Sequence, residues 1–160
     1  MVKIEAGRVT DGHEGPLVVF LIGMRVNRWR RVRAWWPVFT AMPAMLRELS
    51  QQRERGLLGY QTTLGRSGPV LVQYWRGADE LLAYAHDVDG EHRPAWRAFQ
   101  GRARTAGPVV GIWHETYQVA AGAHESVYVA MPVTGLAAAT SGVPVARRGD
   151  TASRRLGRAA

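Results

Sequence analysis

The sequence contains no cysteine. This absence excludes disulfide bonds, thiolate nucleophiles and cysteine-ligated metal sites, and it is typical of a reducing compartment, so we expect a cytoplasmic protein. The sequence also lacks an unbroken apolar segment long enough to cross a bilayer, because the uncharged stretch 126–146 is interrupted by Pro132, Gly135, Gly142 and Pro144. No small-residue cleavage site follows the short apolar run from Pro16 to Met24. We therefore expect neither a membrane span nor a signal peptide.

Several catalytic motifs are missing as well. There is no His-Glu-x-x-His zinc motif, no glycine-rich phosphate loop, no serine in a nucleophile elbow and no paired-carboxylate arrangement. These absences argue against hydrolases, kinases, nicotinamide-dependent dehydrogenases and glycosidases. The six tryptophans and five tyrosines instead favour a cavity for a small, largely apolar ligand.

Acidic residues are few, at 13 against 21 basic residues, which gives a net charge of +8. Residues 147–158 hold five arginines and one aspartate, so +4 of that charge lies in a segment rich in Gly, Ala and Ser. Such a composition predicts a disordered basic tail over residues 141–160. The polar, turn-rich residues 1–15 predict a flexible arm, which leaves one domain over residues 16–140.

A second basic segment, residues 28–33, is interleaved with Trp29 and precedes Trp35 and Trp36. Aromatic side chains beside arginines are found at nucleic-acid and membrane surfaces. A loop that enters an amphipathic helix gives the same pattern, with tryptophans buried and arginines exposed. We favour the second interpretation and expect no nucleic-acid or membrane partner.

Hydrophobic periodicity predicts strands over residues 17–25, 57–64, 70–75 and 109–119, with a four-residue loop, 65–68, joining the second and third. It predicts a long helix that begins near Pro37 and ends at Gly56, then helices over 78–86 and 92–104, and a short extended segment at 128–131. In the first helix, apolar residues that recur every three or four positions should face the sheet: Trp35 or Trp36, Phe39, Met42, Met45 or Leu46, and Leu49.

The order βαββαβ is that of the α+β ferredoxin-like fold. Strands this apolar cannot leave the uncovered face of their sheet in water, so we expect a homodimer in which two such faces meet, a dimeric α/β barrel.

Short motifs spread over residues 17–140 strengthen this interpretation. Together they resemble the fumagillin-pathway-type monooxygenase family, long known only as a domain of unknown function, within the dimeric α/β barrel superfamily that also holds the antibiotic-biosynthesis monooxygenases. The resemblance implies a dimeric barrel and oxygen chemistry. It is carried by Gly23-Met24-Arg25-Val26-Asn27, Gly56-Leu57-Leu58-Gly59-Tyr60-Gln61, Tyr74-Trp75-Arg76 with Leu81, Tyr84 and Ala85, His92 with Trp96 and Phe99, Trp113-His114-Glu115-Thr116-Tyr117, and Met131-Pro132 with Gly135-Leu136.

A narrower segment, Trp75-Arg76 followed by Leu81, Leu82, Tyr84, Ala85 and His92, is similar to the part of haem-dependent aldoxime dehydratases in which a histidine holds the haem iron. That similarity implies that His92 would be the axial ligand if haem is bound. Two alternatives for the cofactor therefore stay open, none or haem.

The candidate catalytic residues are His92, His114 and Glu115. Alternation along the last strand sends His114 to one face of the sheet and Glu115 to the other, where burial would require a partner such as Arg25 or Arg76. Each candidate also has a structural interpretation, as a helix cap for His92 and as a dimer-fixing ion pair for Glu115. The candidate substrate-binding residues are Asn27, Trp75, Arg76, Trp96, Phe99 and Tyr117.

These observations predict a monooxygenase-like enzyme for a small, largely apolar organic substrate of secondary-metabolite type. In this hypothesis His114 or His92 deprotonates or orients the substrate, Trp75 and Trp96 shape the pocket, and Asn27 and Arg76 bind polarised oxygen. The alternatives are a haem-dependent aldoxime-dehydratase-like lyase and a non-enzymatic protein that binds an apolar ligand.

Overall fold

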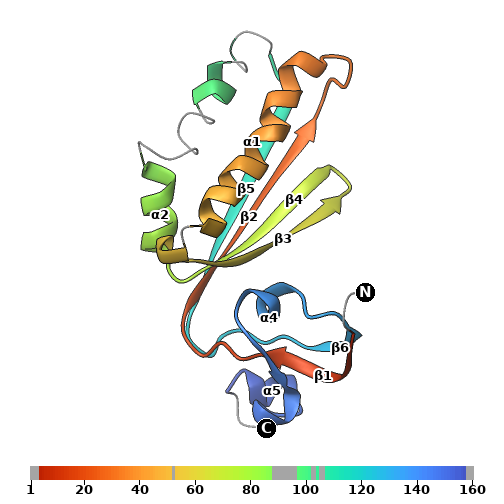
Figure 1. Cartoon of the computed structure of the whole chain (residues 1–160), viewed down its shortest axis with the longest axis vertical. Helices are drawn as coiled ribbons and strands as arrows, with labels where there is room; N and C mark the ends of the chain where they lie inside the picture. The colour runs from red at the N-terminus through yellow and green to blue at the C-terminus, as the bar shows by residue number, and fades with distance from the viewer. Residues whose placement is uncertain (1–3, 52, 88–96, 102–103, 105–106, 158–160) are drawn as a thin grey trace.

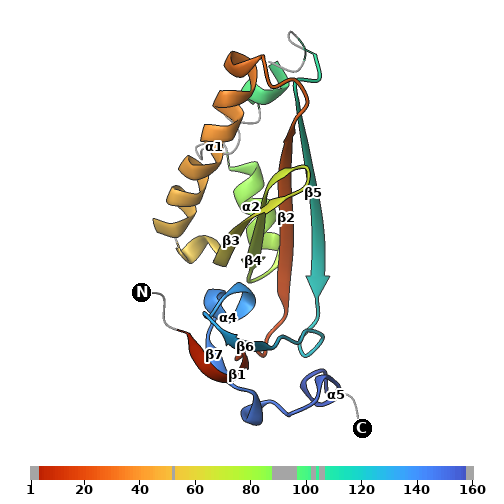
Figure 2. The ribbon, with the colours of Figure 1, turned by 90° about the vertical axis from the view of Figure 1, so that its right-hand side faces the viewer.

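A computed structural model describes residues 4–51, 53–87, 97–101, 104 and 107–157. Its larger part is a four-stranded antiparallel sheet in the order β3-β4-β2-β5. The strands are β2 (Leu17–Val26), β3 (Leu57–Gly65), β4 (Gly68–Trp75) and β5 (Val110–Val119), and α1 (Val32–Gln51) and α2 (Ala78–His86) lie on one face (Figures 1 and 2). The chain order β2-α1-β3-β4-α2-β5 confirms the predicted α+β, ferredoxin-like fold.

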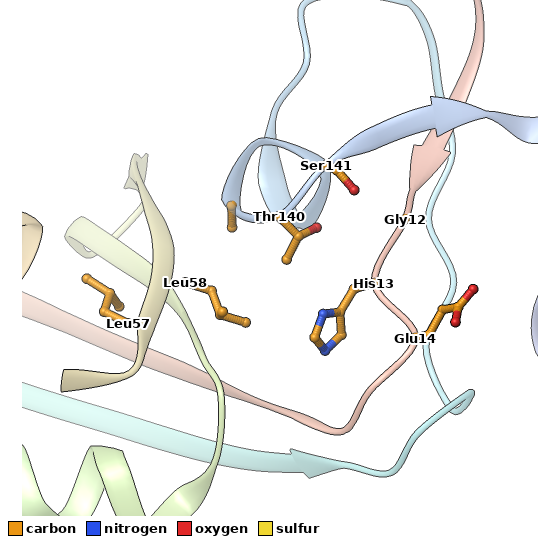
Figure 3. Close-up of a pocket in the computed structure, with 8 residues that line it drawn as sticks. Gly12, His13, Glu14, Leu57, Leu58, Thr140 and Ser141 are labelled. Atoms are coloured by element: carbon orange, nitrogen blue, oxygen red, sulfur yellow. The ribbon is translucent and has the colours of Figure 1, made fainter. Parts of the chain in front are cut away.

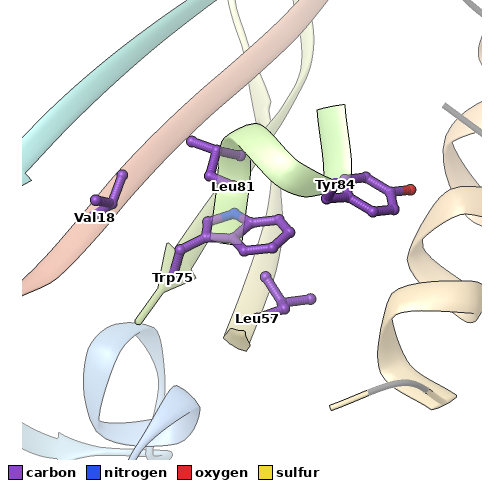
Figure 4. Close-up of a cluster of buried hydrophobic side chains, with 5 residues drawn as sticks. All are labelled: Val18, Leu57, Trp75, Leu81 and Tyr84. Atoms are coloured by element: carbon purple, nitrogen blue, oxygen red, sulfur yellow. The ribbon is translucent and has the colours of Figure 1, made fainter. Parts of the chain in front are cut away.

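The core lies between this sheet and α2. At its centre Trp75 is wholly inaccessible to solvent. Its ring packs against that of Tyr84, with the two ring centroids 5.8 Å apart. The indole nitrogen of Trp75 donates a hydrogen bond of 2.8 Å to Oε1 of Gln73, so its only polar atom is satisfied inside the core. The other buried members are Val18, Leu57 and Leu81 (Figure 4).

The β3–β4 hairpin is tighter than predicted. Gly65 pairs with Gly68, so the turn contains only Arg66 and Ser67 instead of a four-residue loop. Gly68 has φ +133°, and a Cβ at this position would lie 2.3 Å from the carbonyl oxygen of Met24. Only glycine permits both this backbone conformation and this close approach.

Helix α1 begins at Val32, five residues before the proline at which the sequence predicted its start, and it contains Pro37 and Pro43. Leu46 faces the core at 8% exposure, as the predicted apolar stripe requires. Trp36 and Phe39, at 52% and 43% exposure, do not. The prediction that this stripe faces the sheet is therefore wrong for the first turns of α1. At Met42, Met45 and Leu49 the description covers the backbone only.

A second, three-stranded sheet occupies the other end of the molecule, in the order β6 (Tyr128–Met131), β1 (Glu5–Asp11), β7 (Gly142–Pro144). Around it lie α4 (Gly135–Ala139) and α5 (Ala152–Arg155) (Figure 1). The predicted flexible arm over residues 1–15 and disordered tail over 141–160 are therefore corrected, because their described residues include β1, β7 and α5.

Buried ion pairs explain why the basic tail is folded. Asp11, fully buried, accepts hydrogen bonds of 2.9 Å from both the guanidinium of Arg148 and the hydroxyl of Ser126. Arg155, only 6% exposed, pairs with Glu125 at 2.9 Å. Composition alone predicted solvated arginines, whereas these two are neutralised by carboxylates more than 25 residues away in the chain.

The small sheet is attached to the larger one through α4. A Cβ at Gly59 of β3 would lie 2.7 Å from Ala139, and Oε1 of Gln61 accepts hydrogen bonds from Thr134 and from the amide of Gly135. The C-terminal segment thus covers one end of the sheet face that α1 and α2 leave open. Within the part of the chain described, none of the helices is sufficiently long and apolar to traverse a bilayer.

Candidate functional site

Strand register assigns each predicted site residue to one face of the large sheet. His114 lies opposite Ile22, which lies opposite the buried Leu71. Residues directly opposite each other in antiparallel strands point to the same face. Leu71 and Trp75 both lie on the core side of β4, so His114 points to the face covered by the helices. The sequence had left open which of the two faces His114 takes.

On this face the imidazole of His114 packs against Phe20, with ring centroids 5.7 Å apart. Phe20 in turn packs against the hydrophobic core. His114 is itself exposed, since β5 is an edge strand that the helices cover incompletely. A neutral imidazole that is accessible on one side and backed by an aromatic ring can accept a proton from an apolar substrate.

Glu115 and Tyr117 lie on the opposite face. The hydroxyl of Tyr117 donates a hydrogen bond of 2.6 Å to Glu115, and this bond, together with the carboxylate's negative charge, raises the pKa of Tyr117. His114 and Glu115 therefore cannot contact one small substrate within a single subunit.

The predicted arginine partners of Glu115 lie elsewhere. Arg76 approaches Glu80 at 3.6 Å. Arg25 is opposite Gly111, four residues along β5 from Glu115, a separation of about 13 Å along the strand. The expected ion pair within one subunit is therefore not formed with either arginine.

The uncovered face is otherwise apolar. At its centre Trp113 lies over Gly23, where a Cβ would come within 2.5 Å of the indole ring. Register places the following neighbours on the same face: Val19 and Leu21 of β2, Val70 and Val72 of β4, and Tyr117 of β5. We refer to this set, with Trp113, as the open face.

Asn27 and Arg76 occupy opposite ends of the sheet. Asn27 follows the last residue of β2 and donates from Nδ2 to the carbonyl of Pro108 at 3.2 Å. Arg76 follows Trp75, which pairs with Val18 near the first residue of β2. The two are separated by roughly 30 Å along the strand, so they cannot bind one oxygen molecule together.

Of the remaining predicted residues, Trp75 is a core side chain without exposed surface, and Phe99 is half-buried in the helical segment 97–101. His92 and Trp96 lie outside the described residues. No cluster of three or more metal-ligating side chains occurs among the residues the structure describes.

A pocket of about 550 Å³ between the two sheets was not predicted. It is lined by His13, Glu14, Leu57, Leu58 and Thr140 among others (Figure 3). Next to the lining residue His13, Nε2 of His124 lies 3.1 Å from Oδ1 of Asp11 and 3.0 Å from the carbonyl of His13. No sequence motif identifies His13 or His124, because the hydrogen bonds that His124 makes to Asp11 and to the carbonyl of His13 span more than 100 positions in the chain.

Comparisons with known proteins found similar solved structures and one matching family. The chain is similar to solved structures of a conserved protein of unknown function, described as a possible oxidoreductase, from Bacteroides thetaiotaomicron VPI-5482 (16% identity, 66% of this chain and 99% of that one, TM-score 0.41). Another similar structure is a dimeric protein of unknown function with a ferredoxin-like fold from Bacteroides fragilis NCTC 9343 (12% identity, 64% of this chain and 95% of that one, TM-score 0.45).

A third similar structure is a candidate antibiotic-biosynthesis monooxygenase from Caulobacter crescentus CB15 (17% identity, 66% of this chain and 91% of that one, TM-score 0.37). No curated protein matches the chain. Residues 17–136, which span the ferredoxin-like unit and reach the start of α4, match the family described as Monooxygenase af470-like. The chain therefore belongs to the Monooxygenase af470-like family.

Proposed function

We propose that this protein is a monooxygenase that oxidises a small, largely apolar organic substrate bound on the helix-facing side of its sheet, beside Phe20 and His114. The observation that carries the proposal is the 5.7 Å ring contact between these two residues on an accessible edge strand. Family membership supports the reaction class, and the aromatic surroundings support an apolar substrate.

His114 is the proposed general base. Its imidazole removes a proton from an activated C–H group of the substrate, and the resulting carbanion transfers an electron to dioxygen. Recombination forms a C–O bond, and loss of water then gives R₂CH₂ + O₂ → R₂C=O + H₂O. All four electrons come from the two C–H bonds, so this route needs no separate reductant.

The proposed enzyme is a cytoplasmic homodimer, joined through the open face. Glu115 and Tyr117 lie there, so we assign them to dimer contacts, and the chemistry to His114. The apolar character of this face supports the assignment, because sheet faces of this kind are normally covered.

Replacement of His114 tests the proposed base. We expect His114→Ala to lower kcat for oxygen uptake by about 10²- to 10⁴-fold, the usual contribution of a general base, with electron-rich benzylic ketones and hydroquinones as the substrate panel. The matched control is His86→Gln, since the ring of His86 contacts only the carbonyl of Leu82 in its own helix among the described contacts. Equal turnover in native protein and His114→Ala would refute the assignment.

The cofactor is tested separately by the absorbance spectrum of protein purified with haem supplied. A Soret band that is lost in His92→Ala would assign the oxygen chemistry, or an aldoxime dehydration, to haem. Oxygen uptake by haem-free protein, with incorporation of one atom from ¹⁸O₂, would support the substrate-driven route. If the protein binds apolar ligands but shows no turnover with or without haem, it is a ligand-binding protein and not an enzyme.

A further inference from the structure

The end of the molecule at which β2 leads into α1 carries an exposed aromatic cluster, defined by Trp29, Trp35, Trp36 and Phe39. Trp29 is 67% exposed, and Trp36 and Phe39 are 52% and 43% exposed. This end lies opposite the small sheet (Figures 1 and 2). Single exposed apolar residues are ordinary, but a contiguous group of four large aromatic rings marks an interaction surface.

The cluster is ordered by its own contacts. Ring centroids are 5.6 Å apart for Trp29 and Trp35, 5.8 Å for Trp35 and Trp36, and 5.9 Å for Trp36 and Phe39. The indole nitrogen of Trp35 donates a hydrogen bond of 3.1 Å to the carbonyl of Trp29, which ties the loop to the helix. The rings therefore form one compact apolar wedge.

The charged residues in the chain segment that carries the wedge have one sign. No acidic residue occurs between Glu14 and Glu48, whereas six arginines do, at positions 25, 28, 30, 31, 33 and 47. Arg28, Arg30 and Arg33 are exposed beside the rings. Such a surface attracts an anionic partner at a distance and an apolar one on contact.

We propose that this end of the molecule docks on the surface of an anionic lipid bilayer. Tryptophan rings are stable at the headgroup level, and arginines that flank them bind lipid phosphates. The surface lies at one end of an elongated molecule, so the wedge can enter the headgroup layer while the small sheet stays in water (Figure 2).

Ring geometry favours lipid over single-stranded nucleic acid. Trp36 and Phe39 are stacked on each other at 27°, and Trp35 meets its neighbours edge-on at 67° to 88°. Bases stack on aromatic faces that are free and spaced along a groove. Here the rings contact one another, one pair stacked and the others edge to face, so the cluster forms a compact wedge and not a row of free faces on which bases could stack.

Docking requires no assumption about the reaction. If the proposed function is correct, the bilayer is also where an apolar substrate concentrates, and docking would bring the enzyme to it. The binding experiment below contains no substrate, so its failure would leave the proposed function untouched.

Vesicle co-sedimentation tests the proposal. We expect the full chain to bind vesicles of phosphatidylcholine with about one-third phosphatidylserine, to bind pure phosphatidylcholine far less, and to dissociate as salt rises. Each arginine near an anionic surface strengthens binding about fivefold, so Arg28→Gln/Arg30→Gln/Arg33→Gln should weaken it roughly 100-fold. The matched control, Arg8→Gln/Arg147→Gln/Arg154→Gln, removes three exposed charges in the part of the chain that forms the small sheet and its surroundings, and should retain most binding.

The aromatic contribution has its own variant. Trp29→Ser/Trp36→Ser should weaken vesicle binding by about tenfold or more, because binding scales with the apolar area inserted. The control Leu64→Ser/Leu82→Ser removes two other exposed apolar side chains, at 82% and 52% exposure, and should leave vesicle binding unchanged. Circular dichroism of each variant checks that the fold is intact.

Three results would overturn the proposal. Equal losses in the two arginine variants would mean that only net charge matters. Patch-dependent binding to a single-stranded oligonucleotide, without binding to vesicles, would assign the surface to nucleic acid. A change of oligomeric state in Trp29→Ser/Trp36→Ser, measured by sedimentation equilibrium, would assign it to a contact between copies of this chain.

Discussion

At the scale of single residues, environment separates side chains that the sequence treats alike. Trp75 and Trp29 are both tryptophans beside an arginine, yet one is wholly buried and the other is 67% exposed. Tyr74 and Tyr117 both have a raised pKa, but for different reasons. Burial is the main cause for Tyr74, with the nearby Tyr128 contributing, whereas a hydrogen bond to Glu115 is the main cause for Tyr117.

The raised pKa of Tyr74 makes stability depend on pH in alkali. The unfolded chain loses this proton near pH 10 and the folded chain only at higher pH, so folded protein binds more protons in that window. The free energy of unfolding should therefore fall as pH rises above about 10. We expect a shallower fall in Tyr74→Phe, measured by urea denaturation between about pH 8 and 11. An unchanged slope, matching that of the exposed Tyr60→Phe, would contradict this assignment.

At the scale of elements, the small sheet depends on the buried carboxylate of Asp11. Its partners come from three separate segments: the hydroxyl of Ser126, the guanidinium of Arg148 and the amide of His13. His124 also contacts this carboxylate, at 3.1 Å through Nε2, while its Nδ1 is buried without a hydrogen-bond partner among the described residues. The cluster therefore joins β1 to the chain on both sides of α4.

Removal of this carboxylate charge should destabilise the small sheet. We expect Asp11→Asn to lower the free energy of unfolding by about 3 kcal/mol, because it removes a fully buried carboxylate charge and leaves the partly buried Arg148 without its counter-charge. Trypsin should then cleave after Arg148 and Arg155 much faster than in native protein. Asp150→Asn, at an exposed position near the same segment, is the control. Equal trypsin resistance of the two variants would show that Asp11 does not hold the tail.

At the scale of the whole molecule, the two faces of the large sheet carry different sets of side chains. The helix-facing side carries His114 and Phe20, and the open face carries Trp113, Glu115 and Tyr117. The small sheet and α4 cover only one end of the open face, near Gly59 and Gln61. The apolar remainder is the surface through which we propose that two copies pair.

A charge at the centre of the open face should prevent this pairing. Leu21→Glu inserts a carboxylate opposite Val72 and Glu115, where desolvation and like-charge repulsion oppose association. We expect a monomer by sedimentation equilibrium at concentrations where native protein is dimeric. Leu64→Glu, on an 82% exposed residue at the hairpin end, should remain dimeric. A dimer of unchanged affinity in Leu21→Glu would exclude the open face as the interface.

The fold class follows from the sequence alone, because apolar runs and three- to four-residue periodicity are local properties that specify strands and helices. It predicted α2 and β6 with their observed ends, and it separated His114 from Glu115 by simple alternation.

Tertiary contacts, in contrast, were needed to learn which face His114 takes, how far apart Asn27 and Arg76 lie, and why the basic tail folds. It also reversed the expectation for Trp36 and Phe39, because an amphipathic pattern predicts a buried stripe but not how far the sheet extends beneath it. The physical reason is the same in each case: strand register, ion pairs such as Asp11–Arg148, and burial all join residues distant in the chain.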